Sequence, residues 1–238
     1  MHLNFSGSLP LSAPYLFLFD IDGTLLSSSG AGKFALESAL LDTFNLENIR
    51  VQVPYSGRTD AAIARDLLHA HDIEPTQERI TSLQEAYLQR LPQALESRQG
   101  AVLPGVTPLL NQLISMQQEV LMGLLTGNIR RGAEVKLGHF QLYHYFRFGG
   151  FGDNLLTRDE VAHSAWRAAQ KEYPGELVPD RTWVVGDTPL DISCARAIGA
   201  RVLAVATGHH SREELTHHRA DLVLDSLEDP SLLGRLLA

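Results

Sequence analysis

The chain has 238 residues, of which 44% are apolar and 20% charged, and a formal net charge of −8 at pH 7. This composition is typical of a globular protein with a sizeable core and excludes intrinsic disorder. The negative charge and the scattered basic residues argue against nucleic acid or an anionic membrane surface as the main partner. No apolar stretch of the sequence is long enough to span a bilayer.

The sequence favours a cytoplasmic location. Cys194 is the single cysteine and therefore has no partner for an internal disulfide. Residues 1–14 lack the basic start and the continuous apolar centre of a signal peptide.

Two aspartates follow the first strongly apolar run of the chain, residues 15–19. A run without polar alternation predicts a strand that is buried on both faces, as in a parallel sheet. Residues two apart in an extended chain share a side, so Asp20 and Asp22 are expected to face one site. Two carboxylates this close repel unless one is protonated or a cation lies between them. Gly23 then allows the chain to turn at positive φ.

The next part of the chain, residues 28–103, has helical periodicity and no convincing strand. Small residues precede it and the turn signal Pro104-Gly105 follows it, so its two linkers are expected to lie close together. We predict that residues 28–103 are an inserted helical domain and that residues 1–27 and 104–238 form the core. The expected helices cover residues 34–44, a segment capped by Thr59 or Asp60 that ends at Leu68, and a segment from Thr76 towards Arg90.

Strands and helices alternate after residue 104, which predicts right-handed crossovers and a parallel sheet. The fold class is therefore α/β, with a Rossmann-like parallel sheet core and the helical insertion. The expected strands are residues 120–125, 145–148, 183–186, 202–206 and a short one at 222–224, and the expected helices are residues 107–117, 133–140, 158–171 and 192–198.

Polar residues also follow two later strands: Thr126-Gly127-Asn128 after one and Asp187 after another. The carboxyl ends of parallel strands meet at one edge of the sheet, where ligands bind. We therefore expect these residues to lie close to Asp20 and Asp22.

These motifs resemble those of the haloacid dehalogenase superfamily over nearly the whole chain. Asp20 to Leu25 resembles its first motif, Thr126 its second, and Gly186 to Asp191 its fourth, and the insertion is similar to its helical cap. The third motif departs from the usual pattern because the superfamily commonly has a lysine there. Arg158 takes that position, as in some phosphoglycolate-phosphatase-like members, while Lys136 is interpreted as structural. The alternative for Arg158 is an exposed residue at a helix start.

The resemblance implies a phosphatase that uses Mg²⁺. Asp20 would form an aspartyl-phosphate, and Asp22 would donate and then accept a proton, which calls for a raised pKa at the first step. Thr126, the amides of Gly127 and Asn128, and Arg158 would bind the phosphoryl oxygens. The implied metal ligands are Asp20, the backbone carbonyl of Asp22, and Asp187, with Asp191 behind them.

Two of these residues have an equally simple structural interpretation. Asp191 follows a strand and could serve only as a helix cap. Arg58, in a segment that resembles the substrate loop of the cap, could meet a substrate carboxylate or phosphate, or could simply precede the helix capped by Thr59.

Three functions are compatible with this pattern. The favoured one is hydrolysis of a small-molecule phosphate monoester by a phosphoglycolate-phosphatase-like enzyme. The others are a β-phosphoglucomutase-like phosphotransferase and a binding or regulatory protein that retains the fold without turnover. The sequence indicates neither which ester is the substrate nor the oligomeric state.

Overall fold

The computed structural model of the chain describes residues 13–116 and 120–237. Most of the segment 1–14 and the last residue of the expected helix 107–117 therefore lie outside the described residues.

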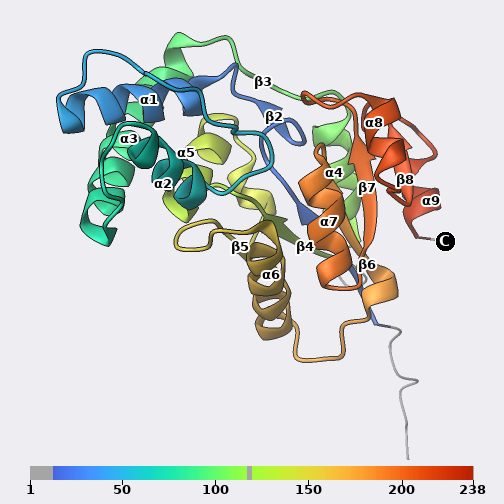
Figure 1. Cartoon of the computed structure of the whole chain (residues 1–238). Helices are drawn as coiled ribbons and strands as arrows, with labels where there is room; N and C mark the ends of the chain where they lie inside the picture. Colours follow the sequence, from blue (N-terminus) through green and yellow to red (C-terminus); the bar gives the residue numbers. More distant parts are fainter. Residues whose placement is uncertain (1–12, 117–119, 238) are drawn as a thin grey trace, which may run out of the picture.

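The core is a six-stranded sheet in the order β5-β4-β1-β6-β7-β8, in which every neighbouring pair is parallel. This confirms the α/β Rossmann-like fold class (Figure 1). The first strand of the sequence is central, so its carboxyl end opens at the middle of the sheet edge. The strands are β1 (Tyr15–Phe19), β4 (Val120–Leu125), β5 (Gly149–Gly150), β6 (Thr182–Gly186), β7 (Arg201–Val205) and β8 (Leu222–Leu224).

Helices cover both faces of the sheet. Phe17 and Phe19 of β1 belong to the apolar cluster under α4, α5 and α9. Leu16 and Leu18 point to the opposite face and pack with α6, α7 and α8. Side chains of a strand alternate between faces, so a strand that is apolar throughout is buried on both. The bounds of these helices are α4 (Val106–Ser115), α5 (Arg130–His139), α6 (Arg158–Glu172), α7 (Pro189–Ala197), α8 (Arg212–His217) and α9 (Leu232–Leu236), and two 3-10 turns are η1 (Tyr143–Tyr145) and η2 (Pro179–Arg181).

The expected strand at residues 145–148 is wrong. Tyr145 instead ends the 3-10 turn η1 and residues 146–148 follow it without regular structure, and Phe146 packs against Phe19 with ring centroids 5.8 Å apart. The edge strand next to β4 is instead the glycine pair β5. Glycine is required at Gly150 because α6 packs so close that a Cβ there would overlap the Val161 carbonyl. An edge strand of two glycines has no hydrophobic pattern by which to recognise it.

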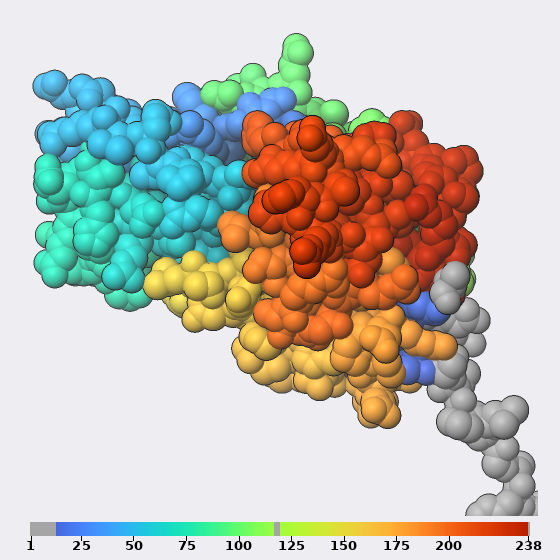
Figure 2. All heavy atoms as spheres, turned by 45° about the vertical axis from the view of Figure 1, so that its right-hand side comes forward, coloured from blue at the N-terminus to red at the C-terminus, as the bar shows by residue number. Residues whose placement is uncertain are grey.

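Three helices lie between the short strands β2 (Leu26–Ser27) and β3 (Ala101–Val102), which pair antiparallel and bring the two linkers side by side. We call residues 28–103 the helical insertion. Its helices share an apolar cluster that includes Leu40, Leu67 and Leu91, and they form a lobe beside the rest of the chain (Figures 1 and 2). Its helices are α1 (Ala31–Phe44), α2 (Asp60–Ala70) and α3 (Gln77–Ser97).

Two of the expected helix caps in the insertion are confirmed. The hydroxyl of Thr59 accepts from the Ala62 amide, and that of Thr76 accepts from the Arg79 amide. Over residues 13–116 and 120–237, the helices include none with the length and apolar character needed to cross a membrane.

Candidate active site

The two aspartates of the first motif leave β1 at the mouth of a cavity of about 300 Å³ between the sheet edge and the helical insertion. Pairing with β6 continues through Asp20, whose amide donates to the Val185 carbonyl over 2.9 Å. Asp20 and Asp22 both line the cavity, whereas Ile21 is fully buried in the core. Gly23 turns the chain at φ 86°, a conformation that glycine adopts without strain.

Arg158 reaches Asp20 from the first residue of α6. A capping box between Thr157 and Glu160 fixes the start of this helix and therefore the position of Arg158. Its Nη1 donates to Asp20 Oδ1 over 3.2 Å, and its Nη2 donates to the Leu125 carbonyl over 3.3 Å and to Asp191 Oδ1. Its side chain is only 3% exposed. Arg158 is therefore part of the site, and the alternative of an exposed arginine is wrong.

Three carboxylates gather at this point. One oxygen each of Asp20, Asp187 and Asp191 lies within 4.8 Å of the other two. Asp187 accepts from the hydroxyl of Thr24 over 3.1 Å. Two glycines give Asp187 its space, because a Cβ at Gly23 would press against its Oδ2 and a Cβ at Gly208 would overlap it.

Asp191 has two roles. Its Oδ2 accepts from the amide and hydroxyl of Thr188 over 3.0 and 2.8 Å, which makes it the third helical residue of the capping box of α7. Its Oδ1 faces Arg158. The helix-cap interpretation is thus correct, and Asp191 also reaches the carboxylate cluster.

The charges of this cluster are mutually unfavourable. Burial raises the pKa of Asp20 to about 7, although Arg158 opposes the rise and Asp191 and Asp22 add to it. Burial, Asp191 and Asp20 together raise the pKa of Asp187 to about 9. A buried carboxylate group of this kind is stabilised by protons or by a cation.

The second motif forms the wall beside Asp22. Thr126 is fully buried, and its hydroxyl accepts from the side-chain amide of Asn128 over 2.8 Å. Gly127 and Asn128 line the cavity, and Thr126 does not. The Gly127 carbonyl accepts from the Asp60 amide over 2.8 Å, and a Cβ at Gly127 would overlap the Arg58 carbonyl. The glycine therefore lets the helical insertion dock on this loop.

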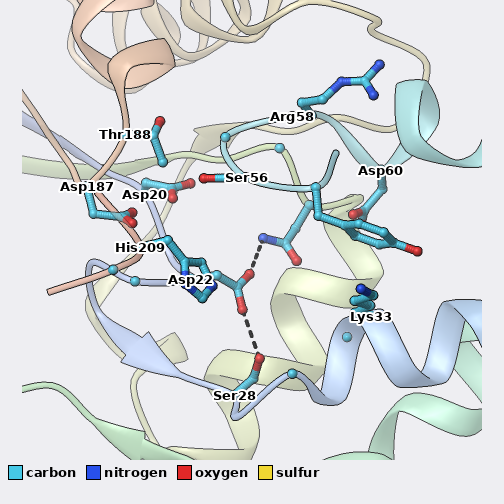
Figure 3. Close-up of a pocket in the computed structure, with 18 of the residues that line it drawn as sticks. Asp20, Asp22, Ser28, Lys33, Ser56, Arg58, Asp60, Asp187, Thr188 and His209 are labelled. Atoms are coloured by element: carbon cyan, nitrogen blue, oxygen red, sulfur yellow. Dashed lines mark hydrogen bonds between the residues drawn. The ribbon is translucent and has the colours of Figure 1, made fainter. Parts of the chain in front are cut away.

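Arg58 lines the cavity but directs its guanidinium elsewhere. Its Nη1 donates to Asp66 Oδ2 over 2.7 Å and to the Pro54 carbonyl over 3.3 Å. Figure 3 shows the guanidinium pointing away from Asp20 and Asp187. The structure therefore does not bring this predicted substrate ligand to the carboxylates.

Lys136 is the residue that the sequence analysis missed. Its Nζ, on α5, donates to Asp22 Oδ2 over 2.6 Å and to Asn128 Oδ1 over 2.7 Å, and it lines the cavity. The structure therefore brings Lys136 to the candidate site, where the sequence analysis did not place it. A signal was present in the sequence: this lysine lies on the helix face that Ala133 and Leu137 bury, where an ammonium needs a partner.

The pKa of Asp22 moves opposite to the sequence-based expectation. Burial raises it, but the Lys136 charge and hydrogen bonds from Lys136, Asn128 and Ser28 outweigh burial and hold the pKa below 3.8. The Ser28 hydroxyl donates to Asp22 Oδ1 over 3.2 Å, and the Asn128 side chain donates to Oδ2 over 2.9 Å (Figure 3).

Comparisons with known proteins agree with this geometry. The family model described as haloacid dehalogenase-like hydrolase matches residues 17–205. Phosphoglycolate phosphatase 1 of Pseudomonas aeruginosa is 28% identical over 232 residues, covering 91% of this chain and 78% of the relative. Phosphoglycolate phosphatase of Synechococcus elongatus is 27% identical over 223 residues, covering 89% and 93%. The crystal structure of a CbbY variant from Rhodobacter sphaeroides in complex with xylulose-(1,5)bisphosphate superposes with a TM-score of 0.71 at 16% identity, covering 91% and 96%.

Proposed function

Because the chain belongs to the haloacid dehalogenase-like hydrolases, we propose that it is a magnesium-dependent phosphatase of small phosphate monoesters that works through an aspartyl-phosphate on Asp20. One observation carries the proposal. Asp20 lines a cavity, Arg158 donates to its carboxylate, and two further buried carboxylates lie within 4.8 Å. The names of the relatives add that the substrate class includes esters such as phosphoglycolate.

Asp20 is the proposed nucleophile. Its Oδ1 is engaged by Arg158, so the other oxygen is available to attack phosphorus. Arg158 has a second use, because its guanidinium can bind a phosphoryl oxygen while it neutralises Asp20 and Asp191. The backbone amides of Gly127 and Asn128 supply further donors to the transferring group.

Asp20, Asp187 and the backbone carbonyl of Asp22 are the proposed ligands of Mg²⁺. Hard oxygen donors suit this ion, and three buried carboxylates with one buried arginine leave a surplus of negative charge. Both carboxylate oxygens of Asp191 are engaged, by Arg158 and by Thr188, so we assign Asp191 to the support of the ligands and not to direct contact with the ion. Bound Mg²⁺ would lower the repulsion between the carboxylates and an anionic substrate.

Asp22 is the proposed general acid and base. It gives a proton to the ester oxygen as the bond to phosphorus breaks, and it later takes a proton from the water that attacks the aspartyl-phosphate. Lys136 lowers the pKa of Asp22, whereas an arriving phosphate dianion, as a like charge, raises it. The carboxylate is 38% exposed to the cavity, so a leaving group can approach it.

The helical insertion is proposed to be a cap domain on a core of residues 1–27 and 104–238. It supplies one wall of the cavity, and its closure would exclude water and bulky esters. The partners in this proposal are small-molecule phosphate esters, and the location is the cytoplasm.

The test is a panel of phosphate monoesters that includes phosphoglycolate and sugar phosphates, assayed for released phosphate with Mg²⁺. The wild type is compared with Asp20→Asn, which retains the shape of the side chain. We expect turnover of at least one ester by the wild type and none by the variant. Equal phosphate release by both proteins would overturn the mechanism. The absence of turnover by the wild type on every ester would favour a binding or regulatory protein.

A further inference from the structure

Lys136 is a buried cation that the proposed chemistry does not yet use. Its side chain is 6% exposed, and it belongs to α5, eight residues after Asn128. Its ammonium donates to Asp22 Oδ2 and Asn128 Oδ1 over 2.6 and 2.7 Å. The two buried cations that line the cavity thus have separate carboxylates: Arg158 pairs with Asp20, and Lys136 pairs with Asp22.

Gly32, on helix α1 of the helical insertion, leaves space for the Lys136 ammonium. A Cβ at Gly32 of α1 would lie 3.2 Å from Nζ and 3.4 Å from Cε, so only a residue without a side chain leaves that space open. The Tyr87 hydroxyl would lie 3.9 Å from the same Cβ, and Lys136 opposes the rise of the Asp60 pKa, which burial takes to about 6. A buried ammonium is stable only with such partners.

The hydrogen bonds at Asp22 are distributed unequally between its two oxygens. Oδ2 accepts from Lys136 and from the Asn128 side chain. Among the described residues, the Ser28 hydroxyl is the one side-chain donor to Oδ1, over a longer distance of 3.2 Å. A hydroxyl can rotate to accept instead of donate, whereas an ammonium can only donate. Oδ1 is thus the oxygen on which a proton can be carried.

We propose that Lys136 is a positioning residue that anchors Oδ2 of Asp22 and so directs Oδ1 at the ester oxygen of the substrate. This inference rests on the proposed function. In the first step the proton on Oδ1 moves to the ester oxygen, the phosphorus–oxygen bond breaks, and a bond from Asp20 to phosphorus forms. In the second step water attacks phosphorus, its proton returns to Oδ1, and Asp20 is released. Lys136 touches neither the phosphoryl group nor the leaving group in either step.

The dependence on the leaving group distinguishes positioning from a structural role. A general acid matters for an alkyl phosphate, whose leaving oxygen is strongly basic, and much less for 2,4-dinitrophenyl phosphate, which leaves without a proton. Lys136→Met retains the length of the side chain and removes the charge. We expect it to lower the single-turnover rate of leaving-group release by on the order of 10²-fold for the alkyl ester and by less than about fivefold for the dinitrophenyl ester. This measurement isolates the first step, because the later hydrolysis of the aspartyl-phosphate is common to both esters. KM should change little for either ester, and Lys136→Arg should recover part of the loss.

The matched control is Lys171→Met, which removes an exposed lysine from the end of α6 and should leave both rates unchanged. A merely structural role of Lys136 would lower the amplitude or the single-turnover rate of leaving-group release by the same factor for both esters, which would overturn the assignment. Unchanged alkyl-ester turnover in folded Lys136→Met would overturn it as well. A wild type inactive on both esters would instead overturn the proposed function together with this inference.

A second comparison answers the question if Lys136→Met does not fold. The double variant Asp22→Asn/Lys136→Met removes both charges of the pair and leaves no unpaired ammonium or carboxylate. If Lys136 acts through Asp22, the double variant should have the same alkyl-ester kcat as Asp22→Asn within about twofold, because residues that act as a unit are not additive. A further loss of tenfold or more in the double variant would contradict the proposal.

Discussion

Arg158 Nη1 donates to Asp20 Oδ1 over 3.2 Å, although the two residues are 138 positions apart in the sequence. Asp20 directly follows the central strand β1 and Arg158 begins α6, so the topology brings the two residues together. The same guanidinium holds Asp191, and its Nε is a buried nitrogen without a hydrogen-bond partner among the described residues. A cation that lines the cavity and is held by two carboxylates is well placed to bind a phosphoryl oxygen.

Arg158 variants test this placement. We expect Arg158→Lys to retain part of the activity because the charge survives, and Arg158→Ala to lose about 10²-fold or more in kcat. The alanine variant also leaves two carboxylates buried without their partner, so its free energy of unfolding should fall by about 3–5 kcal/mol. The measurements are kcat and KM on one ester, and urea unfolding.

The matched control for Arg158 is Arg167→Ala, at an exposed position of the same helix. Its free energy of unfolding should stay within about 0.5 kcal/mol of the wild type, and kcat should not change. A folded Arg158→Ala protein with the kcat of the wild type would remove Arg158 from the proposed mechanism.

Asp20→Asn tests the nucleophile directly. The amide fills the same volume but does not form the acyl phosphate, so turnover should disappear. The fold should persist, because Arg158 retains Asp191 as a partner. Circular dichroism checks the fold, and mass spectrometry of acid-quenched samples checks for a phosphorylated peptide that contains residue 20 in the wild type alone. Phosphorylation of the variant at another residue would reject Asp20 as the nucleophile.

The sheet and its functional edge could be predicted from the sequence because buried strands followed by polar residues leave a clear local pattern. Asp20, Asp22 and Asp187 were expected to lie near one another from parallel topology alone, and the structure brings them to one cavity. The strand β5 could not be predicted, since its two glycines carry no hydrophobic signal.

Contacts that depend on the direction of a side chain also could not be predicted from the sequence. Nothing local to Arg58 indicates that Asp66, eight residues later on the next helix, takes its guanidinium. Likewise, the pairing of Lys136 with Asp22 spans 114 positions and depends on the angle at which α5 leaves the Thr126 loop. The pKa of Asp22 was misjudged for the same reason, because its direction is decided by this partner.

The stability of the metal-free protein should depend on pH through Asp20 and Asp187. Their folded pKa values of about 7 and about 9 lie above the ordinary 3.8, so the folded state binds more protons than the unfolded state between these values. The free energy of unfolding therefore falls as the pH rises from about 4 to about 9. Thermal unfolding in a chelator at a series of pH values measures this, and a rise in Tm from pH 6 to pH 9 would contradict it.

Added Mg²⁺ should oppose this loss of stability. The ion replaces the protons that leave the carboxylates, so the increase in Tm that it causes should be larger at pH 8 than at pH 6. Asp187→Asn serves as the control: it should be more stable than the wild type in chelator at pH 8, because it removes the free-energy cost of protonating a buried carboxylate on folding, and it should gain little from Mg²⁺. An equal Mg²⁺ response in both proteins would exclude Asp187 as a ligand.

Gly208→Ala tests whether the space around Asp187 matters for activity. The new methyl group would overlap Asp187 Oδ2, so the carboxylate has to move from its present position. A displacement of about 1 Å of a catalytic group can cost on the order of 10²-fold in rate, and we expect a loss of kcat of this size together with a higher Mg²⁺ requirement. The control is Gly138→Ala on α5, where no atom lies within 4 Å of the new Cβ. That variant should retain full activity and gain roughly 0.5–1 kcal/mol in stability, because alanine loses less backbone freedom in a helix. Wild-type kcat and Mg²⁺ dependence in Gly208→Ala would show that the position of Asp187 is not critical, and Asp187 would then have to be withdrawn from the proposed metal site.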